Sequence, residues 1–225
     1  MAQFILMLTR DDVTVPNALE LVREAVETPV AHIGFKDIGL PFAEMQEVVD
    51  VIHGAGRSAH LEVVSLAEED ELRSAQTALD LGVDYLLGGT RWRPVGDLIK
   101  GRDIRYFPYP GRVEGHPGTL AGSVDEIVAD AEEMQGSVDG INLLAYRHQT
   151  LDGTDVTAAV VSRVELPVIV AGSIDSIARI ETVTGAGAWG FTIGAAALDC
   201  RVVDGDLRAQ LEAVVAAGAD AGVER

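Results

Sequence analysis

Short apolar runs alternate with amphipathic segments along the whole chain. Segments of helical type repeat their apolar residues at about 3.6-residue spacing, as Val124, Ile127, Val128 and Ala131 do. Between such segments lie eight runs with the length and residue types of β-strands, at 4–9, 30–36, 58–64, 84–90, 104–109, 140–146, 167–172 and 190–194. This alternation predicts a parallel sheet built of βα units.

Local signals mark the ends of these elements. Ser123 and Glu126 have the spacing of a capping box and predict a helix start. Small residues or glycine join helix to strand in "LGVDYLL", "SVDGINL" and "GAWGFTI". Eight strand and helix pairs predict an α/β fold, a single (β/α)8 barrel, with a doubly wound open sheet as the alternative. Since no linker or low-complexity segment interrupts the pattern, we expect residues 1–225 to form one domain.

Composition narrows the classes of partner. The formal net charge of −19 disfavours binding to nucleic acid or to an anionic membrane surface. No apolar run approaches the roughly 18 residues of a membrane span, and the N-terminus lacks a signal-peptide pattern, so a cytoplasmic protein is expected. Cys200 is the only cysteine, which excludes an intramolecular disulfide and a Cys-rich metal site.

Lysine is rare in this chain, and its position is informative. The sequence contains fifteen arginines but only Lys36 and Lys100 as lysines. Alternation in 30–36 places Lys36 on the inward face of its strand, and alternation in 58–64 places Glu62 on the inward face of the next. We therefore expect a Lys36–Glu62 pair at the C-terminal mouth of the barrel, where catalytic residues of this fold lie. A structural ion pair is the alternative interpretation.

Other polar residues form a second group of candidates. His32 and His60 share the inward faces of the same two strands one layer deeper, where a packed core histidine is as plausible as a catalytic one. Tyr146 and Asn142 are expected on the inward face of the sixth strand, where they can supply hydrogen bonds. Arg10 and Arg147 follow strands one and six, where each can hold an anion or pair with one of the many carboxylates.

A phosphate site is the clearest functional signal. Gly172 and Ser173 follow the seventh strand, and Gly194 and Ala195 follow the eighth and open a short helical stretch. Glycine lets backbone N–H groups approach an anion, and in many barrels these two loops bind phosphate. Tight turns are the alternative reason for the glycines.

The longest loop of the chain follows strand five. The segment 108–123, "PYPGRVEGHPGTLAGS", is rich in glycine and proline. It is predicted either to close over a substrate and carry Arg112 and His116 inward, or to be a disordered surface excursion.

The closing segments resemble a known superfamily. "PVIVAGSI" and "GAWGFTIGAAALD" are similar to the end of the ribulose-phosphate-binding barrels, which include phosphosugar epimerases, isomerases, decarboxylases and synthases. Within it they look most like N-acetylmannosamine-6-phosphate 2-epimerase. That resemblance implies a catalytic lysine, matched by Lys36, and a glutamate before the strand-seven glycine, where this chain has Ala171, so that Glu62 would have to act as the base.

Two other members share fewer features. "HIGFKD" and "SAHLE" resemble ribulose-phosphate 3-epimerase, and His32 and His60 match two of its metal ligands. Gly34 and Ala171 stand at the acidic positions, so no metal is predicted. A lysine ending strand two, with "AGSI" and "GAA", is similar to (5-formylfuran-3-yl)methyl phosphate synthase, which implies a Schiff base on Lys36.

These observations predict an enzyme that acts on a small phosphorylated sugar or related carbonyl metabolite without a cofactor. Isomerisation or epimerisation by Lys36 and Glu62 is the first hypothesis, and a lyase or synthase with a Lys36 imine is the second. A non-catalytic barrel that binds a phosphorylated metabolite is the third. The sequence leaves open which sugar is bound, and whether the protein forms a homodimer.

Overall fold

Eight parallel strands form the centre of the molecule, which is seen here in a computed structural model that describes residues 2–220. In their order around the sheet, the strands are β10 (Ile141–Leu143), β11 (Val168–Val170), β12 (Gly190–Ile193), β1 (Gln3–Met7), β4 (His32–Lys36), β5 (Ser58–Val63), β6 (Tyr85–Gly88) and β7 (Arg105–Phe107). Two backbone hydrogen bonds connect the ends of the sheet, from the Asp139 N–H to the Tyr106 carbonyl and from the Asn142 N–H to the Pro108 carbonyl. The strands thus form a nearly closed barrel, as predicted.

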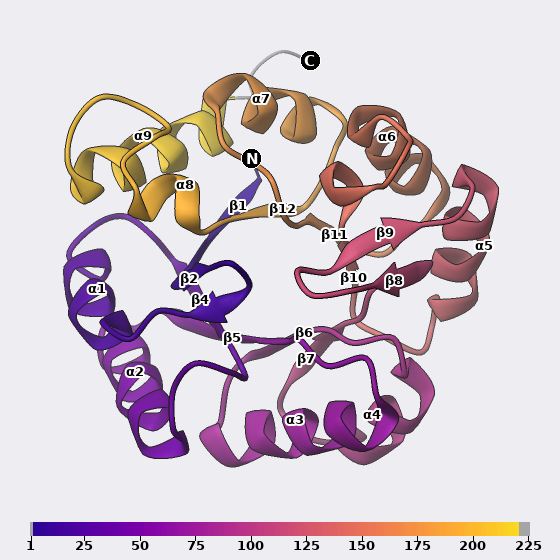
Figure 1. Cartoon of the computed structure of the whole chain (residues 1–225), viewed down its shortest axis with the longest axis horizontal. Helices are drawn as coiled ribbons and strands as arrows, with labels where there is room; N and C mark the ends of the chain where they lie inside the picture. The colour runs from indigo at the N-terminus through magenta and orange to yellow at the C-terminus, as the bar shows by residue number, and fades with distance from the viewer. Residues whose placement is uncertain (1, 221–225) are drawn as a thin grey trace.

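Helices surround the strands on the outside (Figure 1). They are α1 (Ala18–Ala25), α2 (Phe42–Gly54), α3 (Glu68–Leu81), α4 (Trp92–Ile99), α5 (Val124–Met134), α6 (Gly153–Arg163), α7 (Ile177–Gly185) and α9 (Leu207–Asp220), with the short α8 (Ala195–Leu198) before α9. The predicted capping box is present, since the Ser123 hydroxyl accepts from the Glu126 N–H and the Glu126 carboxylate accepts from the Ser123 N–H. Gly82 ends α3 in the left-handed conformation, at φ 69°.

Two small hairpins lie over the barrel on the side facing the viewer in Figure 1. The first consists of β2 (Thr9–Arg10) and β3 (Val13–Thr14), and the second of β8 (Arg112–Glu114) and β9 (Thr119–Ala121). The predicted loop 108–123 is therefore mostly an ordered hairpin. Its Arg112 and His116 are exposed. That this segment closes over a substrate and carries them inward stays a prediction.

The core has two parts, one between strands and helices and one inside the barrel. The interior part is a compact apolar cluster of Ile5, Met7, Tyr85, Leu87, Phe107 and Ile169, with Trp189 half-buried beside it. This packing fills the barrel interior below the mouth. No helix among residues 2–220 is long and apolar enough to cross a membrane.

Candidate functional site

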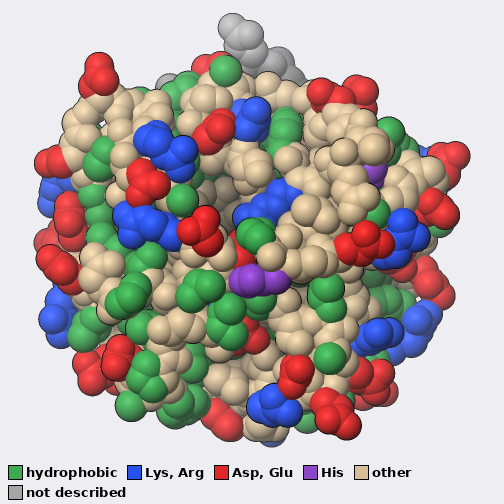
Figure 2. All heavy atoms as spheres, in the orientation of Figure 1, with side chains coloured by type: hydrophobic (Ala, Val, Ile, Leu, Met, Phe, Trp, Pro, Cys, Tyr) green, Lys and Arg blue, Asp and Glu red, His purple; other side chains and the backbone are tan. Residues whose placement is uncertain are grey.

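A cavity of about 590 Å³ opens at the C-terminal ends of the barrel strands. Figure 2 shows a hollow near the middle of this face, with basic and acidic side chains around it. The charged side chains that line it are Asp11, Asp12, Lys36, Glu62, Arg147, Asp175 and Arg201. A packed barrel with a charged mouth is the arrangement in which (β/α)8 barrels place their active sites.

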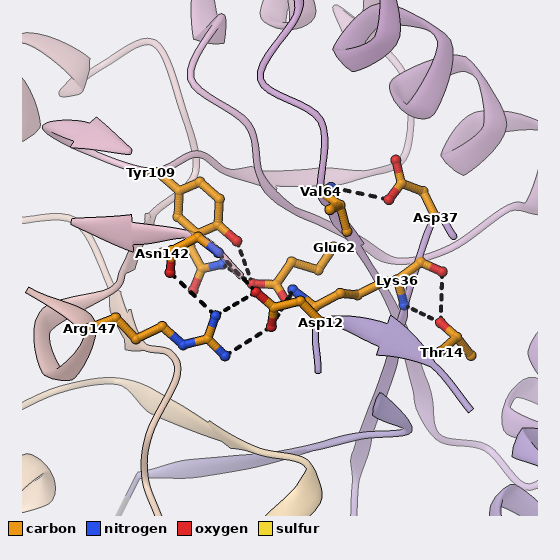
Figure 3. A network of polar contacts seen from close by, with 10 residues as sticks. Asp12, Thr14, Lys36, Asp37, Glu62, Val64, Tyr109, Asn142 and Arg147 are labelled. Carbon is orange, nitrogen blue, oxygen red and sulfur yellow. Dashed lines mark hydrogen bonds and ion pairs between the residues drawn. The ribbon is translucent and has the colours of Figure 1, made fainter. Parts of the chain in front are cut away.

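Lys36 lies at the centre of a polar network at this mouth (Figure 3). It pairs in register with Glu62 on the adjacent strand, as the alternation of the two strands predicts. Its ammonium lies 2.9 Å from Glu62 Oε2 and 3.3 Å from Asp12 Oδ1, and only 5% of the residue is exposed. Thr14 fixes the backbone beneath it, because its hydroxyl accepts from the Lys36 N–H at 2.8 Å and donates to the Lys36 carbonyl at 2.9 Å.

Glu62 is held on both of its oxygens. Oε1 accepts hydrogen bonds from the Tyr109 hydroxyl at 2.7 Å and from Asn142 Nδ2 at 3.1 Å. Burial would raise the pKa of Glu62, but the Lys36 charge and the Tyr109 hydrogen bond together hold that pKa below its usual value. Each carboxylate oxygen has about two acceptor positions, so Oε1 is saturated while Oε2 retains one position beside Lys36.

Asp12 is a member of the site that the sequence analysis missed. Its two oxygens accept a bidentate pair of bonds from Arg147, at 2.6 and 2.9 Å, and Oδ2 also accepts from the Gly118 N–H at 3.1 Å. Burial would raise the pKa of Asp12, but the Arg147 hydrogen bond and the charges of Lys36 and Arg147 lower it to about 2. Asp12 is thus an ionised bridge between the two cations (Figure 3).

The signal for Asp12 was present in the sequence. "TRDD" follows strand one directly, at the same end of the barrel as Lys36 and Glu62. Tyr109 ends the fifth predicted strand and carries the same signal. Residues that follow a barrel strand at this end are candidates whatever their charge.

The loops after β11 and β12 border the same cavity as Lys36. Gly172, Ser173, Gly194 and Ala195 all line it. Ala195 begins α8, and the first amide groups of a helix have no partner within that helix. These residues can therefore present N–H groups to a ligand that also reaches Lys36.

The two glycines also have packing reasons. Gly172 has φ +77°, and a Cβ there would lie 2.3 Å from Arg147 Nε. A Cβ on Gly194 would lie 2.8 Å from Thr9 Oγ1 and 3.0 Å from the Thr9 carbonyl oxygen. Glycine at 172 lets Arg147 cross the C-terminal end of β11, and glycine at 194 lets the end of β12 approach the turn after β1.

Two further candidates do not line the cavity. Arg10 binds Asp199 at 2.7 Å and does not line the cavity. Tyr146 lies in the 3-10 helix η1 (Ala145–Arg147), because β10 ends at Leu143, and its ring packs on Gly153. It does not line the cavity either. Arg201, which the sequence analysis did not select, does line it.

His32 and His60 lie below the site, in the barrel core. His32 Nδ1 is 3.0 Å from His60 Nε2, and His60 stacks on Tyr85 with ring centroids 4.2 Å apart. Burial lowers the pKa of both rings, so both are neutral at pH 7. Neither lines the cavity, and within residues 2–220 no three His, Cys, Asp or Glu side chains form a cluster that could hold a metal. The packed-core interpretation of the two histidines fits this placement.

Comparison with known proteins identifies the fold. No protein-family model matches the sequence, and a search of curated proteins gives no match. Thiamine phosphate pyrophosphorylase from Pyrococcus furiosus superposes with a TM-score of 0.67 at 15% identity, over 98% of this chain and 96% of that chain. Tryptophan synthase from M. tuberculosis, in its open form, superposes with a TM-score of 0.66 at 15% identity, over 96% of this chain and 92% of that chain. At such identity the likeness establishes what the strand order also shows, that this chain is a (β/α)8 barrel.

Proposed function

We propose that this protein is an enzyme that acts on a small phosphorylated carbonyl compound, as an isomerase or epimerase with Lys36 and Glu62 at the reacting carbon. The observation that carries the proposal is the placement of Lys36. It is a buried amine between two carboxylates, in the wall of a cavity that the loops after β11 and β12 also line.

Proton transfer next to a carbonyl needs a base for the carbon-bound proton and a donor for the developing enolate oxygen. An ammonium has three N–H donors, and Glu62 and Asp12 take two of those of Lys36. The third N–H is the donor for the carbonyl oxygen. Glu62 Oε2 is the base, since its remaining acceptor position lies beside the ammonium and Tyr109 and Asn142 hold only the other oxygen.

The phosphate of the substrate binds at Gly172, Ser173, Gly194 and Ala195 in this proposal. Arg201 is the cation for it, because Arg10 is engaged with Asp199 outside the cavity and both terminal nitrogens of Arg147 bind Asp12. Arg201 is exposed and lies 3.4 Å from Asp199, a contact that a dianion can replace at little cost. The resemblance of the closing segments to the ribulose-phosphate-binding barrels supports the same substrate class.

A Schiff-base lyase or synthase is the second candidate, supported by Lys36 being the only lysine that lines the cavity. In that reaction the neutral Lys36 amine attacks the substrate carbonyl carbon, and water leaves as the imine forms. Asp12 and Glu62 are the two groups positioned to take the ammonium proton first.

Two measurements on a panel of phosphorylated ketoses and aldoses test the proposal. Solvent deuterium should enter the carbon next to the carbonyl of one compound, and Lys36→Met and Glu62→Gln should each lower that exchange by about 10²- to 10⁴-fold. Lys100→Arg, which changes the only other lysine, is the matched control and should exchange normally.

Borohydride trapping followed by peptide mass spectrometry separates the two chemistries. An adduct on Lys36 supports the imine route, and exchange without an adduct supports proton transfer. Binding of a phosphorylated compound with neither exchange nor adduct would contradict both enzymes and favour a barrel that only binds its ligand.

A further inference from the structure

Asp12 occupies a position that suits the anionic group of a ligand. Its carboxylate is held between the Lys36 ammonium at 3.3 Å and the two terminal nitrogens of Arg147 at 2.6 and 2.9 Å. A planar guanidinium fork opposite a carboxylate is the geometry by which proteins bind carboxylate and phosphate ligands. In this structure the carboxylate in that position is the side chain of Asp12.

We propose that the space between Lys36 and Arg147 is a second anion subsite of the cavity, for a carboxylate or phosphoryl oxygen, and that Asp12 fills it until a ligand displaces it. This inference rests on the proposed function and extends it to a substrate with an anionic group at the reacting end as well as a distal phosphate.

Lys36 does not depend on Asp12 for its counterion. The shorter of its two ion pairs, 2.9 Å, is with Glu62, which belongs to barrel strand β5 and is held by Tyr109 and Asn142. Asp12 belongs to the turn of a hairpin with two residues in each strand, outside the eight-stranded sheet. One carboxylate is therefore built into the barrel, and the other is carried by a small peripheral element.

Arg147 stays at the cavity wall whether or not Asp12 is bound. Its side chain crosses Gly172 so closely that a Cβ there would lie 2.3 Å from Nε. Among residues 2–220, its one other polar contact is with the Gly118 carbonyl oxygen at 3.4 Å. If Asp12 leaves, a half-buried cation is left facing the cavity without a carboxylate, and an anionic ligand satisfies it.

Asp12 stands at a position of the β2–β3 turn whose backbone conformation favours glycine. Asp11 and Asp12 both have positive φ, 50° and 58°, as the two central residues of a type I′ turn do, and glycine or asparagine adopts this conformation most readily. Asp11 is exposed, whereas Asp12 is 6% exposed and reaches inward. The side chain at position 12 thus has a role that the turn alone does not require.

The charge of the cavity supports displacement. Four acidic side chains and three basic ones line it, an excess of one negative charge that disfavours an anionic ligand. Withdrawal of Asp12 leaves three of each sign. Asp12 also accepts from the Gly118 N–H at 3.1 Å, so its departure breaks a hydrogen bond between the turn of the β2–β3 hairpin and the turn of the β8–β9 hairpin.

Binding of inorganic phosphate to Asp12→Gly and Asp11→Gly, measured by calorimetry, tests the inference. Both changes place glycine at a positive φ and remove one negative charge from the same turn, but only the first empties the subsite. If Asp12 fills the subsite in most molecules, the apparent affinity for phosphate is reduced to the fraction of molecules in which the subsite is empty. Asp12→Gly should therefore bind phosphate at least about tenfold more tightly than the wild type. Asp11→Gly should change the affinity by less than about threefold, because Asp11 also lines the cavity but is exposed to screening by solvent and forms no ion pair with Lys36 or Arg147.

Arg147→Met in the Asp12→Gly background should abolish the gain, and thermal unfolding verifies that each variant is folded. Asp12→Asn provides a second variant of the same shape. Equal affinities of Asp12→Gly and Asp11→Gly, or a gain that survives Arg147→Met, would overturn the subsite. If the wild type binds phosphate and Asp12→Gly shows no gain, only this inference fails. If no variant binds phosphate, the proposed phosphate site fails with it.

Discussion

Lys36 and Glu62 face each other in register on adjacent barrel strands, with the ammonium 2.9 Å from Oε2. Both are almost fully buried, so the pair has lost its hydration and depends on mutual charge and on the bonds from Tyr109 and Asn142. Removal of the Glu62 charge leaves Lys36 with Asp12, at 3.3 Å, as its remaining carboxylate, and removal of the Lys36 charge leaves Glu62 without its paired cation.

Glu62→Gln should lower the free energy of unfolding by about 3 kcal/mol, the usual cost of breaking a buried ion pair. The measurement is urea denaturation at pH 7. Glu133→Gln is the matched control, because Glu133 forms an exposed ion pair with Arg93 and should lose less than about 1 kcal/mol. Equal losses would mean that the Lys36–Glu62 pair is solvated in solution.

Asp12 should make the protein sensitive to strong acid. Its pKa is lowered to about 2 in the folded state, below the value of 3.8 for a free carboxyl group, so its stabilisation is complete above about pH 4 and is lost as pH falls towards 2. The shift corresponds to roughly 2 kcal/mol. Asp12→Asn should lose about that amount at pH 7 and show a flatter decline between pH 4 and 2. A variant as stable as the wild type at pH 7 would contradict the Asp12–Arg147 pair.

The buried His60 ring should produce a separate loss of stability at weakly acidic pH. Burial, with His32 beside it, lowers the pKa of His60 well below 6.5, so the unfolded chain binds the proton first. Stability is complete above about pH 6.5 and should fall below it by up to about 1.4 kcal/mol per pH unit for this ring. His60→Gln should remove that slope, and His116→Gln, in an exposed turn, should retain it. Denaturation series at pH 5, 6 and 7 measure both.

Gly172→Ala should disturb Arg147 as well as the backbone. A left-handed alanine costs about 1 kcal/mol, and at this position its Cβ would also lie 2.3 Å from Arg147 Nε. Gly82→Ala is the matched control, since Gly82 has φ 69° and nothing within 4 Å of a Cβ. We expect a loss of about 1 kcal/mol for Gly82→Ala, and for Gly172→Ala a larger loss together with weaker phosphate binding. Identical losses with unchanged binding would mean that Arg147 moves freely.

The sequence predicted the barrel because its evidence is local and repeated. Eight apolar runs, each followed by an amphipathic segment, leave few arrangements that bury every apolar face. The predicted ends of the strands were less accurate. The sixth predicted strand, β10, stops at Leu143, and a 3-10 helical turn carries Tyr146 away from the mouth. The ordered hairpin in 108–123 was also not predicted, because the segment is rich in the glycine and proline that are typical of loops.

For the site, the sequence by itself determined that Lys36 and Glu62 share the mouth, because the period of two in a strand and the short step between adjacent strands decide it. It also placed Gly172 and Gly194 in the two loops that border that mouth. Only the tertiary structure decided that Asp12, Tyr109 and Asn142 complete the network and that Arg147 serves Asp12. These contacts join segments as far apart as 135 residues along the chain, and no local pattern specifies which cation a carboxylate on a turn will meet.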